Sequence, residues 1–373
     1  MGRYLFVCHD AGGTIPPVLA MATVLVDRGH QVAILSQPSV ENRARSARCT
    51  FVPFSETGDY RRDAALEQQV DLTVPALVGA AVGRDLLATA ANFVPDVVLV
   101  DPNLSGALAA AETLAVPSVV LLHSLFRTFV DVWFGELWEL LAGPINGTRT
   151  GFGVEEASSW ADMLARHELI LSPVPEILDA PVDDPPDALG HVGFLVPPAL
   201  SDTPIALPPG DDPVVAMSFS TTYQAQERVL EAAFEAVANE PVRVIATTSG
   251  YAPADHPANV VIADFLPHAS LFQHADVVVT HGGLGTVAAA LRAGAPLVCV
   301  PGGRDQPLNA ARVAAVGAGI ACGGGPDPKD LRAAVHEVLR DHSYRRAAAG
   351  VADASRKVGE TEAAANQIER LTR

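Results

Sequence analysis

Short runs of apolar residues alternate with longer amphipathic segments along most of the chain. Residues 4–8 and 32–36 are apolar runs, and residues 17–28 between them show a helical pattern that ends at Gly29. Such runs are typical of strands covered by helices on both faces, and glycine commonly follows the last turn of a helix. The pattern predicts that the chain begins with a parallel βαβ unit.

The alternation continues after this unit and restarts in the second half of the chain. We expect strands at residues 51–54, 97–101 and 118–122, and helices at residues 39–47, from about 64 to 92 and from Leu104. A strand at residues 214–218 begins a second series that extends to Ala321, and helices follow at residues 328–340 and about 344–371. This order predicts the α/β class with two doubly wound, Rossmann-like parallel sheets.

The length and a proline-rich segment predict the domain boundaries. A chain of 373 residues is too long for one ordinary core, so two domains are expected. Residues 197–213 have the composition of a linker. We therefore expect an N-terminal domain over residues 1–196, a linker over 197–213, a second domain over 214–350 and a C-terminal helix over 351–373.

An aromatic segment over residues 125–167 interrupts the alternation. It contains all three tryptophans, Trp133, Trp138 and Trp160. Two interpretations remain open and do not exclude each other. The segment forms an amphipathic helical pair packed on the sheet, or it forms an aromatic wall for an apolar ligand.

The composition of the chain argues against nucleic acid, a membrane and zinc as binding partners. The formal net charge is −18, and an acidic chain repels phosphate backbones, so we expect no nucleic-acid partner. No apolar run is long enough to span a bilayer, and the chain starts with a strand-like run rather than a signal segment. We therefore expect no membrane association and a cytoplasmic location. The four cysteines lack the spacing of a zinc site and are expected to be buried free thiols.

A histidine and a cluster of glycines follow the β-branched run at residues 277–280. A helix begins directly after them, so its free backbone N–H groups point back at the end of the strand and can hold an anion. The flanking glycines allow close approach of a ligand to the backbone. The predicted phosphate-binding residues are His281, Gly282, Gly283, Gly285 and Thr286.

The next apolar strand, at residues 297–300, leads to Asp305 and Gln306. Because the carboxyl ends of parallel strands share one edge of a sheet, these side chains are expected to lie beside the glycine turn. A carboxylate accepts and an amide both donates and accepts hydrogen bonds, as a polyhydroxylated ring requires. The pattern predicts adjacent phosphate and sugar sites.

These residues together resemble a known family. His281-Gly282-Gly283-x-Gly285-Thr286, then Gly294-x-Pro296 and Pro301-x3-Asp305-Gln306, are similar to the donor-sugar signature of the GT-B glycosyltransferases, in particular the family 1-like bacterial enzymes that glycosylate antibiotic-type natural products. The resemblance is best in the C-terminal half. It implies two Rossmann-like domains facing a cleft and a C-terminal helix that crosses back onto the N-terminal domain.

The resemblance also implies the activity. We expect an inverting transferase that moves a sugar or deoxysugar from a TDP- or UDP-sugar to a small aromatic or polyketide-like acceptor, with an O- or C-glycosidic product. The nucleotide sugar is a co-substrate and no further cofactor is expected. No Asp-x-Asp motif sits at a strand end, so no metal is expected. A homodimer is the candidate assembly.

Two further segments match parts of the donor site less closely. Ser220 and Thr221 lie where the family places hydroxyl residues near the diphosphate, but an ordinary strand-to-helix turn explains them equally well. Phe265 and Leu266 resemble the segment whose backbone contacts the nucleotide base. The glutamine common after Pro267 and a stacking tryptophan are missing, so thymidine and uridine both remain open.

The residue that removes the acceptor proton is the least defined part of the predicted site. The resemblance places a histidine in the turn after the first strand, but that position is Thr14, which is not a base at neutral pH. Asp10 in the same turn is expected to face the interdomain cleft, whereas the neighbouring His9 points to the other side, so we favour Asp10. Asp101 resembles the aspartate that orients the family's histidine. An aspartate at a strand end can also simply cap the next turn.

Two other functions compete with this interpretation. Gly283-Leu284-Gly285-Thr286-Val287-Ala288 matches a dinucleotide-binding fingerprint, which would indicate an NAD-dependent oxidoreductase. Asp305 does not directly end the following strand, as that fingerprint requires. The threonine at position 14 would also suit a non-catalytic partner protein that binds a nucleotide sugar without transferring it.

Overall fold

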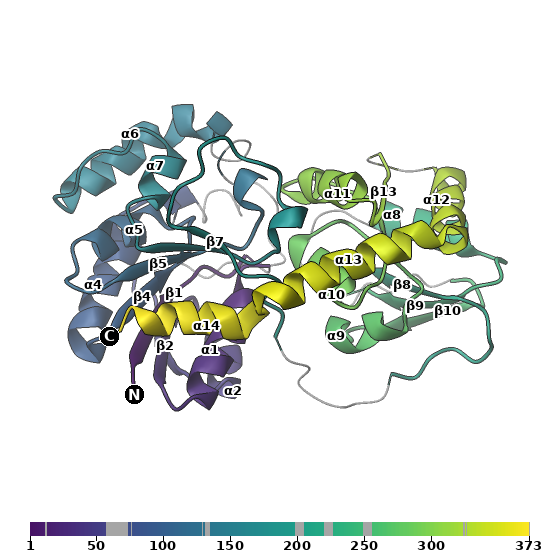
Figure 1. The fold of residues 1–373 in the computed structure, drawn as a ribbon, viewed down its shortest axis with the longest axis horizontal. Helices are drawn as coiled ribbons and strands as arrows, with labels where there is room; N and C mark the ends of the chain where they lie inside the picture. The colour runs from purple at the N-terminus through teal and green to yellow at the C-terminus, as the bar shows by residue number, and fades with distance from the viewer. Residues whose placement is uncertain are drawn as a thin grey trace. The chain divides into compact units, whose positions relative to one another are not determined.

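The computed structural model describes residues 1–11, 13–56, 74–75, 77–128, 130, 135–197, 205–219, 227–248, 256–323, 325 and 327–372. The chain divides into two compact units, each with its own parallel sheet (Figure 1). Unit 1 comprises Met1–Pro197 and Val358–Arg373, and unit 2 comprises Pro198–Lys357. The predicted pair of doubly wound parallel sheets is confirmed.

Unit 1 contains a seven-stranded sheet with the order β3-β2-β1-β4-β5-β6-β7. Every neighbouring pair is parallel. The order runs outward in opposite directions from β1 and β4, which makes the gap between these two strands the topological switch point. The strands are β1 (Arg3–Val7), β2 (Gln31–Ser36), β3 (Thr50–Pro53), β4 (Val97–Val100), β5 (Ser118–Leu121), β6 (Leu169–Ser172) and β7 (Leu189–His191).

Helices cover both faces of this sheet because successive strand residues point to opposite sides. Leu5 and Val7 pack with the helices α4 (Ala81–Phe93), α5 (Ser105–Glu112) and α7 (Trp160–Leu164). Tyr4 and Phe6 pack with α1 (Ile15–Asp27) and α14 (Glu360–Arg370). The described residues of the unit also form η1 (Pro38–Val40), α2 (Glu41–Ser46), α6 (Gly135–Gly151) and η3 (Glu176–Leu178).

Unit 2 contains a six-stranded sheet with the order β10-β9-β8-β11-β12-β13, again parallel throughout. Its switch point lies between β8 and β11. The strands are β8 (Val214–Ser218), β9 (Arg243–Thr247), β10 (Val260–Ala263), β11 (Val277–Thr280), β12 (Leu297–Cys299) and β13 (Gly319–Ala321). The helices are α8 (Glu227–Val237), α9 (His268–Leu271), η4 (Phe272–His274), α10 (Leu284–Arg292), α11 (Gln306–Ala315), α12 (Pro328–Arg340) and α13 (His342–Val358).

The C-terminal segment differs from the single helix expected over residues 344–371. It forms α13 and α14, which are separated at Gly359, where φ is +94°. A positive φ breaks a right-handed helix, and glycine adopts it without a Cβ clash. Beyond the break, α14 packs on α1 through Ala364, Ala365 and Ile368, all fully buried (Figure 1).

Beside this apolar contact, ion pairs join α14 to residues that follow α1. Arg28 pairs with Glu362 and, at 2.9 Å, with Glu369. The Nε2 atom of His30 lies 2.8 Å from the other carboxylate oxygen of Glu369. The C-terminal helix is therefore part of the unit 1 fold.

The aromatic segment forms α6 and α7 within the described residues, and Trp133 lies outside them. Trp160 is buried in the core, and Trp138 packs edge-on against it with ring centroids 6.3 Å apart. This agrees with the helical interpretation of the segment. The strands β6 and β7, which follow it, were not predicted. None of the helices among the described residues is long and apolar enough to cross a bilayer.

All four cysteines are free thiols, and Cys322 alone is half-buried rather than buried. Burial raises the pKa of Cys8, Cys49 and Cys299 to about 12. These three thiols are therefore protonated at neutral pH and act as apolar packing groups.

Candidate functional site

The polar residues singled out in unit 2 gather at the switch point between β8 and β11. Ligands of open α/β sheets bind outside the carboxyl ends of the strands at such a point. Thr280 ends β11, and His281 follows it, while Ser218 ends the neighbouring strand β8. The imidazole of His281 forms a hydrogen bond to the Ser218 backbone. The tips of the two strands are therefore linked through His281.

Glycines shape the turn that holds this imidazole. Gly282 has φ +84°, a conformation that favours glycine. A Cβ atom on Gly283 would lie 2.5 Å from Nε2 of His281, so position 283 accepts no side chain while the ring keeps its place. Gly283 is also the N-cap of α10, whose first N–H groups have no partner within the helix. The turn thus presents backbone N–H groups and an imidazole together.

The structure brings Asp305 and Gln306 next to this turn, at the start of α11. The backbone oxygen of Gln306 would lie 3.1 Å from a Cβ on Gly282. Asn309 joins the two segments, because its Nδ2 donates to Gly282 O at 3.0 Å and to Asp305 Oδ2 at 2.9 Å. Gln306 is buried, and its Oε1 accepts from the N–H groups of Gly302 at 2.9 Å and Gly303 at 3.3 Å.

Asn309 is a structural member of the site that the sequence interpretation missed. It lies four residues after Asp305 on α11, which places both side chains on one face of the helix. This spacing was the signal available in the sequence. In the structure, Asn309 fixes the position of the Asp305 carboxylate relative to the glycine turn.

The segment after β10 combines an exposed ring with a buried imidazole. Phe265 is 73 % exposed and Leu266 is half-buried. His268 stacks on Phe272, and its Nε2 lies 2.8 Å from the Ser218 hydroxyl. Ser220 and Thr221, the other predicted donor residues, lie outside the described residues.

Both imidazoles of this site are uncharged at neutral pH. Burial lowers the pKa of His268 to about 4, and burial likewise lowers that of His281 to about 4 despite the hydrogen bond to Ser218. A neutral imidazole still carries one N–H donor. His281 can therefore donate a hydrogen bond to an anion without bringing a full positive charge.

We expect the imidazole resonances of His268 and His281 to stay unshifted between about pH 8 and about pH 5.5, measured by NMR with assignment through His→Gln variants. In unfolded protein the same side chains take up protons near ~6.5. The unfolded state then binds more protons than the folded state, so stability falls as the pH drops from about 6.5 towards 4. Titration of both rings near pH 6.5 in the folded protein would contradict this assignment.

In unit 1, Asp10 lies at the end of β1 but turns toward the segment after β2. Its Oδ2 accepts from the Ser39 hydroxyl at 2.9 Å and pairs with the Arg43 guanidinium. Its backbone N–H donates to Gln37 Oε1 at 2.9 Å. Thr14 donates its hydroxyl hydrogen to His9 O and accepts from Ala11 N at 3.1 Å, so it closes the same turn. The proposed role of Asp10 as a base stays a prediction.

Asp101 connects the ends of three strands at the carboxyl edge of the unit 1 sheet. Its Oδ2 accepts from the His9 backbone N–H at 3.4 Å, which links β4 to β1. Its Oδ1 accepts from Asn103 N at 2.9 Å and lies 3.4 Å from Nε2 of His123, which follows β5. Burial would raise the pKa of Asp101, but the charge and hydrogen bond of His123 hold it below its usual range. The sequence interpretation did not single out His123, although it follows a strand as His281 does.

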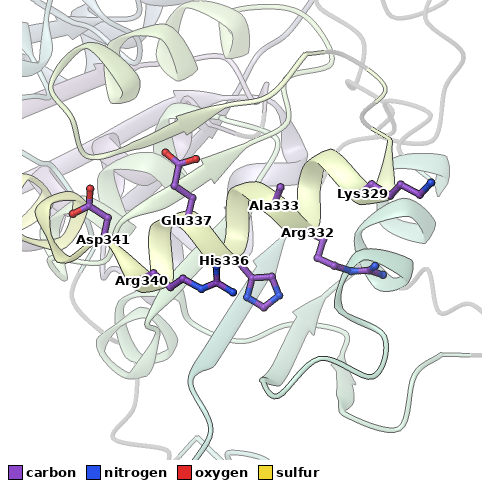
Figure 2. Close-up of a pocket in the computed structure, with 7 residues that line it drawn as sticks. All are labelled: Lys329, Arg332, Ala333, His336, Glu337, Arg340 and Asp341. Atoms are coloured by element: carbon purple, nitrogen blue, oxygen red, sulfur yellow. The ribbon is translucent and has the colours of Figure 1, made fainter.

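A separate surface hollow lies along α12 and is lined by residues of that helix and the residue after it (Figure 2). Arg332 and His336 project to the same side, and both contact Glu240, at 3.1 Å and 2.8 Å. None of the residues assigned above to a ligand site lines this hollow.

Comparison with known proteins shows that the chain is similar to proteins of antibiotic biosynthesis. Residues 227–369 match the family model described as erythromycin biosynthesis protein CIII-like, C-terminal domain. The chain is 28 % identical to 4'-demethylrebeccamycin synthase of Lentzea aerocolonigenes, and the match covers 95 % of this chain and 96 % of that protein.

Solved structures agree over the whole chain. The glycosyltransferase of kitacinnamycin matches with a TM-score of 0.83 and 24 % identity, over 99 % of this chain and 98 % of that chain. The glycosyltransferase VinC, solved in complex with dTDP, matches with a TM-score of 0.74 and 21 % identity, over 99 % of both chains. The chain is a glycosyltransferase with the GT-B fold; it is similar over nearly its whole length to enzymes of natural-product biosynthesis, and its residues 227–369 match an EryCIII-like C-terminal domain.

Proposed function

We propose that this enzyme is an inverting, metal-independent transferase that moves a sugar from a TDP- or UDP-sugar to a small aromatic or polyketide-like acceptor. Unit 2 binds the donor and unit 1 binds the acceptor. The observation that carries the proposal is the link made by Asn309 between the glycine turn and Asp305. This link supports the proposal because it holds the glycine turn, a candidate phosphate site, beside carboxylate and amide groups suited to sugar hydroxyls.

The donor diphosphate is held by local groups rather than by a basic surface. The chain carries a formal charge of −18, so its overall field repels a diphosphate. The N-terminus of α10 supplies N–H groups and the positive end of a helix dipole, and His281 supplies one further donor. These groups stabilise the charge that develops on the leaving diphosphate without a metal ion. The dTDP bound to VinC supports a thymidine donor.

The acceptor is proposed to be apolar because α6 exposes large apolar side chains. Leu140 is 73 % exposed and Leu137 is 38 % exposed, on the helix that also carries Trp138. Exposed leucines next to an aromatic ring suit a flat hydrophobic ligand.

The transfer step is a displacement at the anomeric carbon. The acceptor atom attacks the face opposite the diphosphate and forms the new glycosidic bond. The bond between the anomeric carbon and the β-phosphate oxygen breaks, and the nucleoside diphosphate leaves with the electron pair. The acceptor proton passes to a base of unit 1.

The test combines binding with product analysis in the presence of EDTA. In a thermal-shift panel, TDP or UDP at a hundred times its dissociation constant is expected to add about 2.7 kcal/mol of stability, whereas NAD adds none. TDP-glucose, TDP-rhamnose and UDP-glucose are then incubated with phenolic acceptors, and products are read by mass spectrometry and by the anomeric coupling constant.

The expected result is a glycoside whose anomeric configuration is opposite to that of the donor, at a rate unchanged by EDTA. Stabilisation by NAD alone would favour the oxidoreductase interpretation. Binding of TDP without transfer or hydrolysis would favour the non-catalytic partner. Retained anomeric configuration, or loss of activity in EDTA, would contradict the corresponding part of the proposal.

A further inference from the structure

Ser218 occupies a central place among the strands of the unit 2 sheet. It ends β8, and it lies opposite Thr280 of β11 on one side and Thr247 of β9 on the other. The residue is only 1 % exposed, so its hydroxyl is almost closed off from solvent. A buried hydroxyl requires a hydrogen-bond partner. The partner of Ser218 therefore bears on how the switch point is built.

That partner is His268, which lies 50 residues further along the chain. Its Nε2 atom lies 2.8 Å from the Ser218 hydroxyl oxygen. The imidazole also stacks on Phe272, with ring centroids 4.7 Å apart and an angle of 22° between the ring planes. Phe272 is itself buried. The stack and the hydrogen bond together fix the ring of His268 beside the end of β8.

Ser218 also contacts the second imidazole of the site, through its backbone. His281 follows Thr280, the residue opposite Ser218 in the sheet, and its ring forms a hydrogen bond to the Ser218 backbone. The side chain of Ser218 thus contacts His268, while its backbone contacts His281. A movement of the Ser218 peptide group is therefore expected to move His281 with it.

Packing alone does not account for a histidine at position 268. A phenylalanine would also stack on Phe272, and it would bury no polar nitrogen. Burial lowers the pKa of His268 to about 4, so this environment disfavours a charged ring as well. The bond to the Ser218 hydroxyl is the contact that a phenylalanine could not make. The imidazole therefore holds the serine in addition to stacking.

We propose that His268 is a positioning residue of the donor site. It holds the Ser218 hydroxyl, which fixes the last peptide group of β8, and this peptide group holds His281 in place for the leaving diphosphate. His268 acts through these two residues rather than by contact with the diphosphate. The inference rests on the donor-binding role proposed for unit 2.

The experiment measures kcat and KM with the active nucleotide sugar of the panel. His268→Phe keeps an aromatic ring for the stack on Phe272 and removes the hydrogen bond. We expect it to lower kcat by about 100-fold, because a small misplacement of a group that acts on the reacting atoms has an effect of this size. KM should change little, since the loss falls on the transition state. Ser218→Ala removes the other partner of the same bond and should have a similar effect.

Two further variants separate positioning from packing. His268→Gln places an amide within reach of the Ser218 hydroxyl, and it should recover most of the lost activity although it has no ring to stack. In the His281→Ala background, His268→Phe should cause no further loss of kcat, because it acts through an imidazole that is already missing. A residue that merely supports the fold would lower activity in both backgrounds.

His274→Phe is the matched control, because this exposed histidine lies in η4, close to His268 in the sequence, and it should leave kcat unchanged. NMR gives a readout that needs no nucleotide sugar. The imidazole resonances of His281 should shift in His268→Phe and return towards their wild-type positions in His268→Gln. Thermal unfolding followed by circular dichroism checks that each variant is folded, and Ser218→Ala replaces His268→Phe in every comparison if the latter is not.

The outcomes separate this inference from the function on which it rests. If the wild-type protein transfers sugar and His268→Phe is equally fast, the inference is overturned and the function stands. The inference is also overturned if His268→Phe slows His281→Ala as strongly as it slows the wild type, or if His268→Gln recovers nothing. If the wild-type protein transfers no sugar, the proposed function fails. The His281 resonances then decide the inference, and unchanged resonances in His268→Phe overturn it.

Discussion

Gly283→Ala is expected to lower sugar transfer by about 100- to 1,000-fold while leaving the fold of unit 2 intact. The new Cβ would lie 2.5 Å from Nε2 of His281, so the ring must leave its place at the β11 switch point. Loss of one preorganised donor to a leaving group that gains charge typically costs this much in rate. The measurement is kcat with a saturating nucleotide sugar, together with TDP affinity by calorimetry.

Two comparisons show whether Gly283→Ala acts through the imidazole. His281→Ala should have a similar effect, and the double variant should be no worse than His281→Ala alone, because both changes remove the same donor. Gly350→Ala on α13 is the control, since its Cβ meets nothing within 4 Å and is expected to stabilise the helix by about 0.5–1 kcal/mol. Full activity of Gly283→Ala would mean that His281 does not contact the donor.

Arg149→Met is expected to destabilise unit 1 by about 3–5 kcal/mol. The side chain of Arg149 is fully buried, and its two terminal nitrogens contact the two oxygens of Glu112 at 2.7 Å and 3.0 Å. Its Nε donates to Glu155 O at 2.8 Å. Methionine fills similar space but leaves the largely buried Glu112 carboxylate without its partner. The midpoint of urea unfolding, followed by tryptophan fluorescence, reports on unit 1.

An exposed ion pair of the same unit supplies the matched control. Arg84 pairs with Glu56, and the two side chains are 54 % and 50 % exposed. Arg84→Met should leave the urea midpoint nearly unchanged, because solvent screens an exposed pair. The double variant Arg149→Met/Glu112→Leu should recover much of the loss, since it removes the unpaired charge. Equal effects of Arg149→Met and Arg84→Met would refute the argument from burial.

Periodicity in the sequence predicted the bounds of two elements of unit 2, one of which leads into the glycine turn. The strand expected at residues 277–280 is β11 (Val277–Thr280), and the helix expected at residues 328–340 is α12 (Pro328–Arg340). β-branched runs and a proline at the start of a helix are strong local signals. The prediction missed β6 and β7, which are short and follow an irregular aromatic segment. It also joined α13 and α14, because a glycine inside a helical pattern does not by itself reveal a positive φ.

The placement of Asp305 and Gln306 beside the glycine turn was predictable for a physical reason. Parallel strands that are adjacent in the sheet deliver their following loops to one edge, and β11 and β12 are consecutive along the chain. Strands that follow one another in the sequence are therefore also neighbours in the sheet at this site. Asn309 was overlooked, although its spacing from Asp305 on one helix face was visible.

The side-chain contacts at the carboxyl edge of the unit 1 sheet could not be predicted from the sequence in the same way. The contact between Asp101 and His123 requires β4 and β5 to be neighbours with a particular register, and Asp10 turns toward Arg43 only because η1 and α2 fold against the end of β1. Side-chain direction in a loop follows from partners that are distant in the sequence.

The sequence by itself determined the α/β class, the two parallel sheets and the glycine turn with its neighbouring Asp-Gln pair, because hydrophobic periodicity and glycine placement are local properties that survive without long-range information. Only the tertiary structure decided which imidazole faces Asp101, which carboxylate is tied to a guanidinium and where the terminal helix breaks. These features depend on contacts between segments far apart in the chain, and such contacts exist only once the sheets have formed.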